Sequence, residues 1–150
     1  MQRICRVQQR LFDSVTETAA LDLGARTGAL VTFTGFCRDE GGTLAALEME
    51  CYPEMAEAEI GRVIAEAESR WPLDAALVIH RYGLIRACEP IVLVATAAPH
   101  RAEAFQAAEF LMDYLKTCAP FWKKTHGIDG RVGDWITAKD TDETAAARWR

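Results

Sequence analysis

A chain of 150 residues, half of them hydrophobic and 26% charged, has the size and composition of one globular domain rather than of a disordered segment. The formal net charge of -5 disfavours a general nucleic-acid-binding protein. No stretch approaches the ~20 apolar residues of a membrane helix, and the N-terminus has no apolar run typical of a signal peptide. We therefore predict a single domain over residues 1–150, cytoplasmic, with no nucleic-acid or membrane partner.

The first third of the chain predicts two strands and a short helix. Residues 3–7 fit a short strand, and the β-branched and aromatic residues 28–36 fit a second one. Ser14-Val-Thr-Glu17 has the pattern of a capping box, which predicts a short helix running toward Gly24. Asp39-Glu-Gly-Gly42 predicts a turn or loop.

The middle of the chain predicts a strand followed by a long helix. Leu47, Met49 and Cys51 alternate with acidic residues, as in a strand with one solvent-facing side. Residues 54–71 have apolar positions at spacings of three and four, which predicts an amphipathic helix that Pro72 ends. The apolar positions of this helix are Ala56, Ile60, Val63, Ile64, Ala67 and Trp71.

Two apolar runs of strand length, residues 75–82 and 91–97, precede a second long helix. We expect a loop containing Gly83, Glu89 and Pro90 to join the two strands. The helix is predicted over residues 100–117. The core side of this helix is predicted to contain Ala104, Phe105, Ala108, Leu111, Met112 and Leu115.

The last part of the chain predicts two short closing strands, residues 121–124 and 132–137, and a small helix over residues 140–149. Strands and helices thus mix without a strict βαβ alternation. This order predicts an α+β fold with a mixed, mostly antiparallel sheet and two main amphipathic helices.

All four lysines of the chain lie in its last third, at positions 116, 123, 124 and 139. Lys116 lies at the edge of the apolar side of the second helix and near its end. It is therefore either a cation that caps the helix or a side chain that points into a cleft. Lys123 and Lys124 point to opposite sides of a strand, so at most one of them can join Lys116.

Three further basic residues are candidates for anion binding. Arg38 follows a strand end, where it is either an ordinary turn arginine or a bidentate ligand for a phosphate or carboxylate. His100 and Arg101 begin the second helix. Because that helix is about 25 Å long, they cannot share a small site with Lys116 of the same chain unless the ligand is long or a second chain contributes.

The histidines and cysteines predict neither a metal site nor a cofactor. The three histidines are isolated in the sequence, and His80 is interpreted as a core or edge residue. The five cysteines are widely scattered and form no CxxC pair. Free thiols in a reducing compartment, most of them packed in the interior, are the expected state.

The ordered set of motifs resembles one known family. The longest and most specific is Phe110-Leu-Met-Asp-Tyr-Leu-Lys-Thr-Cys-Ala-Pro-Phe-Trp-Lys-Lys124. The others are Gly28-Ala-Leu-Val-Thr-Phe-Thr-Gly35 with Arg38, Leu47-Glu-Met-Glu-Cys-Tyr-Pro-Glu-Met55, Trp71-Pro72, Val78-Ile-His-Arg81 with Gly83, Ala98-Pro-His-Arg101, Gly133-Asp-Trp135 and Ala146-Ala-Arg-Trp149. Over residues ~28 to 149 this order resembles the large, catalytic subunit of molybdopterin synthase.

This resemblance implies a hammerhead-type α+β fold and a homodimer that binds one small ubiquitin-like subunit on each copy, giving a heterotetramer. It further implies that the small subunit's Gly-Gly tail, carried as a thiocarboxylate, enters a pocket of the large subunit. The sulfur would go to cyclic pyranopterin monophosphate, and two transfers would form the dithiolene of molybdopterin. No cofactor is implied for this sulfurtransferase.

The resemblance also implies roles for particular residues. Lys116 and Lys123 match the essential lysines of the family, although which of the two acts as base stays open. Arg38, His100 and Arg101 match substrate-pocket residues, and Lys139 stands where the family often has a basic residue.

The sequence departs from the family in two places. Cys88 and Pro90 stand in a loop where the family commonly has a Gly-Glu turn, and Phe36 and Cys37 replace residues that are often basic or aliphatic. Two alternative functions follow from the residues. One is an enzyme that carries sulfur as a persulfide on Cys37 or Cys118. The other is a non-catalytic adaptor for a ubiquitin-like tail, which would not need both lysines.

Overall fold

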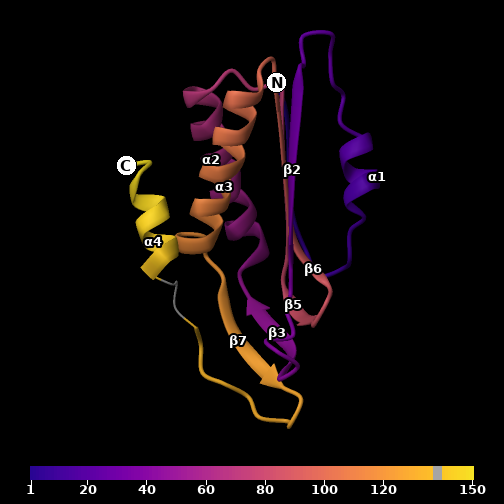
Figure 1. Ribbon diagram of the computed structural model, residues 1–150, viewed down its shortest axis with the longest axis vertical. Helices are drawn as coiled ribbons and strands as arrows, with labels where there is room; N and C mark the ends of the chain where they lie inside the picture. The colour runs from indigo at the N-terminus through magenta and orange to yellow at the C-terminus, as the bar shows by residue number, and fades with distance from the viewer. Residues whose placement is uncertain (137–139) are drawn as a thin grey trace.

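The computed structural model describes residues 1–136 and 140–150 as a layered α+β arrangement (Figure 1). Its elements are β1 (Gln2–Gln8), α1 (Ser14–Ala19), β2 (Ala29–Phe36), β3 (Leu44–Glu50), α2 (Pro53–Arg70), β4 (Ala75–Arg81), β5 (Gly83–Arg86), β6 (Pro90–Ala98), α3 (Arg101–Thr117), β7 (Trp122–Gly127) and α4 (Asp140–Ala147).

The strands form two sheets, and the predicted mixed, mostly antiparallel arrangement is confirmed. The larger sheet has the order β1-β4-β6-β2, in which only β1 and β4 pair in parallel. The smaller sheet has the order β5-β3-β7 and is antiparallel throughout. The prediction of a plain loop between β4 and β6 was wrong, because this segment contains β5. Four residues that pair with β3 are too short to produce a periodic signal in the sequence.

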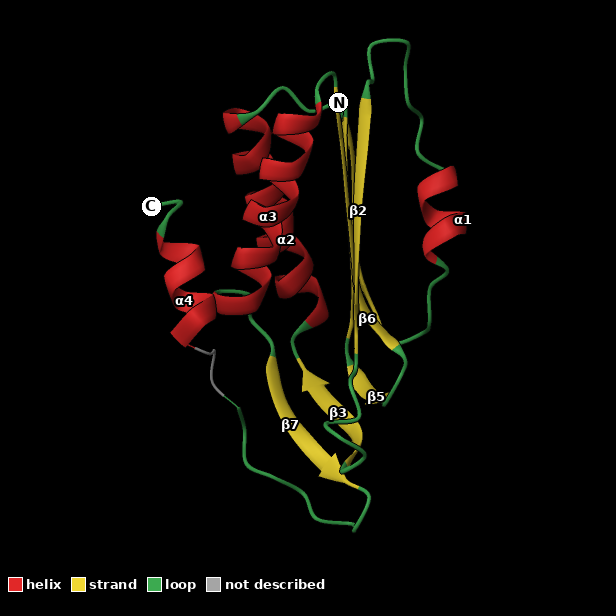
Figure 2. Cartoon of the chain, in the orientation of Figure 1, coloured by secondary structure: helices red, strands yellow, loops and turns green. Residues whose placement is uncertain are grey.

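Helices cover both faces of the larger sheet (Figure 2). α2 and α3 pack on one face, α1 lies on the other, and α4 packs on the outer side of α3. Successive residues of β4 alternate between the two faces: Ala76 and Val78 join the core beneath α2 and α3, whereas Leu77 and Ile79 join the core on the α1 side. The same alternation places His80 on the α3 face, beside the end of that helix.

The two long helices were predicted correctly in extent, but α3 packs through smaller residues than expected. Its buried side chains are Ala104, Ala107, Ala108, Phe110 and Leu111. Phe105, expected in the core, is 57% exposed, so this prediction was wrong. Three of these five residues are alanines, and Phe105 lies outside the face of α3 that they form.

Two predictions at element ends also need correction. The side chain of Asp13, not Ser14, caps α1 by accepting a hydrogen bond from the Val15 amide, and the helix ends at Ala19. The strand predicted over 132–137 forms, within the described residues, only isolated bridges from Val132 and Ile136 to β7. These residues follow β7 in an irregular extended segment (Figure 1).

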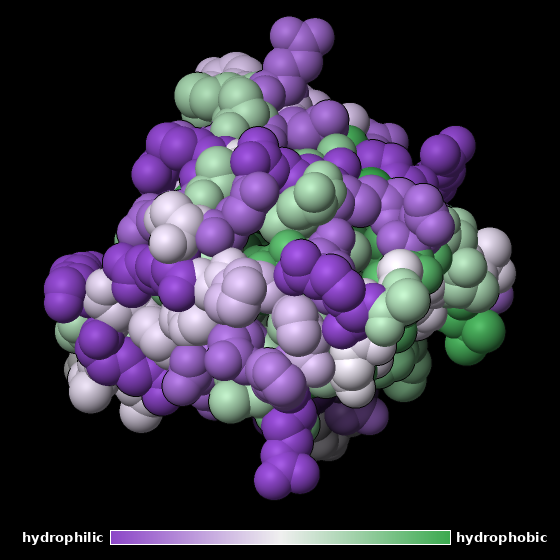
Figure 3. All heavy atoms as spheres, turned by 90° about the horizontal axis from the view of Figure 1, so that it is seen from above, coloured by the Kyte–Doolittle hydropathy of each residue, from purple (hydrophilic) through white to green (hydrophobic). Residues whose placement is uncertain are grey.

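The end of the molecule seen in Figure 3 is mainly hydrophilic, with smaller hydrophobic areas between the charged side chains. In the part of the chain that the structure describes, no helix is long and apolar enough to cross a membrane.

Candidate active site

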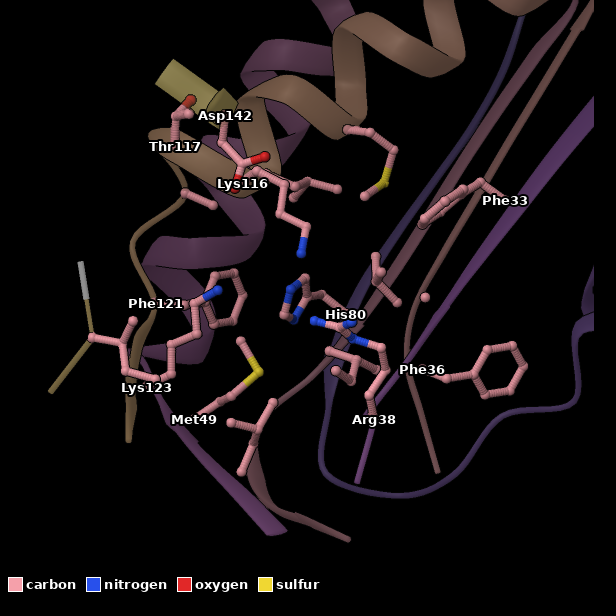
Figure 4. Close-up of a pocket in the computed structure, with 18 of the residues that line it drawn as sticks. Phe33, Phe36, Arg38, Met49, His80, Lys116, Thr117, Phe121, Lys123 and Asp142 are labelled. Carbon is pink, nitrogen blue, oxygen red and sulfur yellow. The ribbon is translucent and has the colours of Figure 1, made fainter. Parts of the chain in front are cut away.

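A pocket of about 250 Å³ lies where the C-terminal end of α3 meets the smaller sheet and the ends of β2, β4 and β6. It has a largely apolar wall and a set of charged groups (Figure 4). The apolar wall includes Phe33, Phe36, Leu44, Leu47, Met49, Ile91, Val92, Met112, Leu115 and Phe121. The charged groups are Arg38, Glu40, Lys116, Lys123 and Asp142.

Lys116 and Lys123 reach this pocket from different elements. Lys116 stands in the last turn of α3, and Lys123 is the second residue of β7. Lys124 points to the other side of β7, where its Nζ lies 2.9 Å from Oε2 of Glu48 and over the ring of Trp135. The expectation that only one of the two adjacent lysines joins Lys116 is therefore confirmed.

Arg38 lines the same pocket from the segment that follows β2. The preceding residue is fixed by two main-chain hydrogen bonds: the Cys37 amide donates to the Glu89 carbonyl at 2.8 Å, and the Cys88 amide donates to the Cys37 carbonyl at 2.7 Å. The guanidinium of Arg38 lies 3.5 Å from a Glu40 carboxylate oxygen, but its side chain remains 71% exposed. An exposed ion pair of this kind is weak, so Arg38 can exchange Glu40 for an anionic ligand.

The two places where the sequence departs from the family pattern thus contact each other. Cys88 has φ +74, a left-handed conformation that favours glycine, in the turn between β5 and β6. The Glu89 carboxylate accepts a hydrogen bond from the Arg86 amide, which together with Arg81 lowers the pKa of Glu89. The turn therefore keeps the shape of a glycine turn despite its cysteine, and it holds the residue before Arg38.

His80 forms part of the pocket floor, although the sequence suggested only a core or edge role. It is 4% exposed, and its ring stacks on Phe121 with centroids 3.9 Å apart. The pKa of His80 is lowered from 6.5 to about 4, mainly by burial and further by the charges of Lys123 and Lys116. In the sequence, this position could have been recognised as a polar residue in register with Ala76 and Val78, on the buried side of the otherwise apolar strand β4.

His100 and Arg101 are not part of this pocket within one chain. Both are exposed at the N-terminal end of α3, the opposite end of the helix from Lys116. Figure 1 shows that this end of α3 lies far from β7. Lys139 lies outside the described residues.

No cysteine lines the described part of the pocket that contains Lys116 and Lys123. Cys37 is 1% exposed, and burial raises the pKa of its thiol, which disfavours the reactive thiolate. Cys118 is exposed, but it lines a separate shallow groove with Tyr114 and Trp149. All five cysteines are free thiols, but the expectation that most are packed in the interior was wrong, because only Cys37 is buried. Among the described residues, no group of His, Cys, Asp and Glu side chains could hold a metal ion.

Comparisons with known proteins identify the family. Residues 7–118 match the model of the MoaE protein family. The chain belongs to the MoaE family. It is 60% identical over 146 residues to a molybdopterin synthase catalytic subunit of Mesorhizobium japonicum, an alignment that covers 97% of this chain and 92% of the relative.

Solved structures of the family have the same fold. A molybdopterin biosynthesis MoaE protein from Burkholderia ambifaria is 45% identical, with a TM-score of 0.82 and coverage of 99% of this chain and 98% of that one. A molybdopterin synthase structure from Staphylococcus aureus is 28% identical, with a TM-score of 0.79 and coverage of 88% and 96%. The α+β architecture expected from the resemblance is therefore the architecture of the MoaE family.

Proposed function

We propose that this protein is the catalytic subunit of a molybdopterin synthase and acts as a sulfurtransferase in molybdenum cofactor biosynthesis. In this proposal, sulfur from the C-terminal thiocarboxylate of a small ubiquitin-like subunit goes to cyclic pyranopterin monophosphate. The observation that carries the proposal is the convergence of Lys116, Lys123 and Arg38, from three separate elements, on one pocket with an apolar wall. Membership in the MoaE family supports the same activity.

The charges of the pocket suit two anionic reactants. A phosphate and a thiocarboxylate both require cations, and the pocket offers Arg38, Lys116 and Lys123 against the acids Glu40 and Asp142. A guanidinium binds a phosphate bidentately, which assigns the phosphate to Arg38. The apolar wall excludes water around the reacting groups and so strengthens their interaction with the ammonium groups.

The two lysines suit the reaction step itself. Sulfur transfer from an acyl group passes through charged tetrahedral species, and a positioned ammonium group stabilises such species. Lys116 and Lys123 enter the pocket from a helix and a strand, so one can face the acyl group while the other serves as acid or base.

We further propose that the active protein is a homodimer in which His100 and Arg101 of one copy complete the pocket of the other. Their exposure at the far end of α3 from Lys116 supports this arrangement, because within one chain these groups cannot reach the pocket. Lys139 is assigned to the same substrate pocket by resemblance alone.

The function is tested by reconstitution. The purified protein is mixed with cyclic pyranopterin monophosphate and either a thiocarboxylated small subunit, the same subunit with an ordinary carboxylate, or inorganic sulfide. Molybdopterin is expected only with the thiocarboxylated subunit. Equal product formation from sulfide would contradict transfer from the protein tail.

Cysteine variants distinguish this mechanism from a persulfide mechanism. Cys37→Ala and Cys118→Ala are each expected to retain most of the turnover, because neither thiol combines exposure with a place beside the lysines. Loss of sulfur transfer in either variant, with an unchanged circular dichroism spectrum, would favour a persulfide carried on that cysteine.

A further inference from the structure

His80 lines the pocket but has no assigned role in the proposed reaction. His80 is the one polar residue on the α3 side of β4. It pairs across the sheet with Val92, another residue of the pocket. Its neighbour Arg81 is buried, and the guanidinium of Arg81 donates hydrogen bonds to the carbonyl oxygens of Gln9 and Pro90. His80, by contrast, presents part of its ring to the pocket.

The hydrogen bonding of the ring fixes its tautomer. Nδ1 of His80 lies 2.8 Å from the carbonyl oxygen of Arg81. A carbonyl oxygen can only accept, so Nδ1 carries the proton, and the neutral ring therefore has its lone pair on Nε2. The face of the ring is covered by Phe121, which stacks on it with an interplanar angle of 20°. Both the proton position and the ring orientation are thus set by fixed neighbours.

Three cationic side chains and two acidic ones line the pocket beside the ring. Lys116 approaches from α3, Lys123 from β7 and Arg38 from the end of β2, and the acids Glu40 and Asp142 line the same pocket. Figure 4 shows the ammonium end of Lys116 pointing toward the His80 ring. A neutral Nε2 in this position can accept a hydrogen bond from an ammonium group without adding charge of its own.

We propose that His80 is a positioning residue: its Nε2 accepts a hydrogen bond from the ammonium group of Lys116 and holds that group in place for sulfur transfer. This inference rests on the proposed function for its catalytic consequence, but the hydrogen bond itself does not. A carboxylate at position 80 would also hold the lysine, but it would cancel the positive charge that two anionic reactants need. A neutral imidazole orients the ammonium group and leaves its charge intact.

The hydrogen bond is tested without any activity assay. Long-range ¹H–¹⁵N correlation spectra of the histidine rings should show His80 as the neutral Nδ1–H tautomer at pH 7. In Lys116→Met, the ¹⁵N chemical shift of Nε2 should move toward the value of a ring nitrogen that accepts no hydrogen bond. In Lys124→Met it should not change, because the Lys124 side chain lies on the other side of β7. An Nε2–H tautomer, or an unchanged Nε2 resonance in Lys116→Met, would overturn the proposal.

The catalytic consequence is tested with two variants of His80 and a matched control. His80→Leu removes the acceptor and should lower the single-turnover rate of sulfur transfer by roughly 10- to 100-fold, the range for a lost hydrogen bond to a charged group. Affinity for the pterin precursor should not change. His80→Gln, whose side-chain oxygen can replace Nε2, should recover most of the rate, and His126→Leu, outside the pocket, should match the wild type.

The possible failures of this test are distinguishable. If the wild type makes no molybdopterin, the proposed function is wrong, whatever the spectra show. If the wild type is active and folded His80→Leu is equally fast, or if His80→Gln is as slow as His80→Leu, His80 does not act as a hydrogen-bond acceptor for the reaction. Circular dichroism and gel filtration identify variants that have lost the fold.

Discussion

Lys116 and Lys124 are a pair of lysines with similar chemistry and different environments. Lys116 lines the pocket, whereas Lys124 is paired with Glu48 on the other side of β7. Of the site residues suggested by the sequence, Lys116, Lys123 and Arg38 meet in one place. Their catalytic roles are proposals that single substitutions can test.

Lys116→Ala should lower single-turnover sulfur transfer by about 10²–10³-fold, because it removes a preorganised charge at the reacting centre. The fold should survive, since the side chain is exposed at the end of α3. Lys124→Ala is the matched control and should retain most of the rate. Near-normal turnover in Lys116→Ala combined with a slow Lys124→Ala would place the reaction on the other side of β7.

Arg38→Ala should act mainly on substrate affinity. Loss of a bidentate contact to phosphate should weaken binding of cyclic pyranopterin monophosphate by roughly 10- to 100-fold, as for other hydrogen bonds between charged groups. Isothermal titration calorimetry measures this directly. Arg26→Ala, an exposed arginine that pairs with Asp74 away from the pocket, serves as the control. Equal affinities for the two variants would show that Arg38 does not bind the phosphate.

At the scale of elements, the turn between β5 and β6 supports the end of β2. Cys88 has a positive φ in this turn, and its amide bonds to the carbonyl of Cys37, one residue before Arg38. A left-handed conformation costs a non-glycine residue roughly 1–2 kcal/mol. The turn is therefore strained at a single residue, and the hydrogen bonds to residue 37 maintain it.

Cys88→Gly should raise the free energy of unfolding by about 1 kcal/mol, because glycine adopts the same φ without steric strain. Cys88→Ala retains a Cβ and should not be stabilised, which separates the backbone effect from loss of the thiol. Urea denaturation of both variants provides the measurement. A Cys88→Gly variant no more stable than Cys88→Ala would show that the turn is unstrained.

At the scale of the whole molecule, one buried titratable group links the site to stability. The pKa of His80 is lowered to about 4 in the folded chain, whereas an unfolded histidine titrates near 6.5. Between these two pH values the unfolded chain binds a proton that the folded chain does not. The free energy of unfolding therefore falls as the pH falls through this window.

The wild type should lose up to about 3 kcal/mol more stability than His80→Gln when the pH is lowered from 7 to 4, from the size of the pKa shift. Thermal or urea unfolding at several pH values measures the difference, and the other titratable groups are common to both proteins. A constant difference between them across this range would mean that the pKa of His80 is not lowered in the folded state.

The sequence alone determined the features that depend on local periodicity and on ordered motifs. Helical spacing predicted α2 and α3, and strand alternation predicted that Lys123 and Lys124 face opposite sides of β7. The ordered motifs indicated the family without any knowledge of the fold. Periodicity succeeded at these elements because each has a buried side long enough to repeat.

Other features were decided only by the tertiary structure. β5 exists because β3 pairs with it, and Phe105 is exposed because α3 packs through a face that does not include it. His80 joins the pocket because the alternation of β4 continues past the core to the end of α3. Each of these features depends on contacts between residues that are distant in the sequence. A local sequence pattern does not show which elements pack against each other.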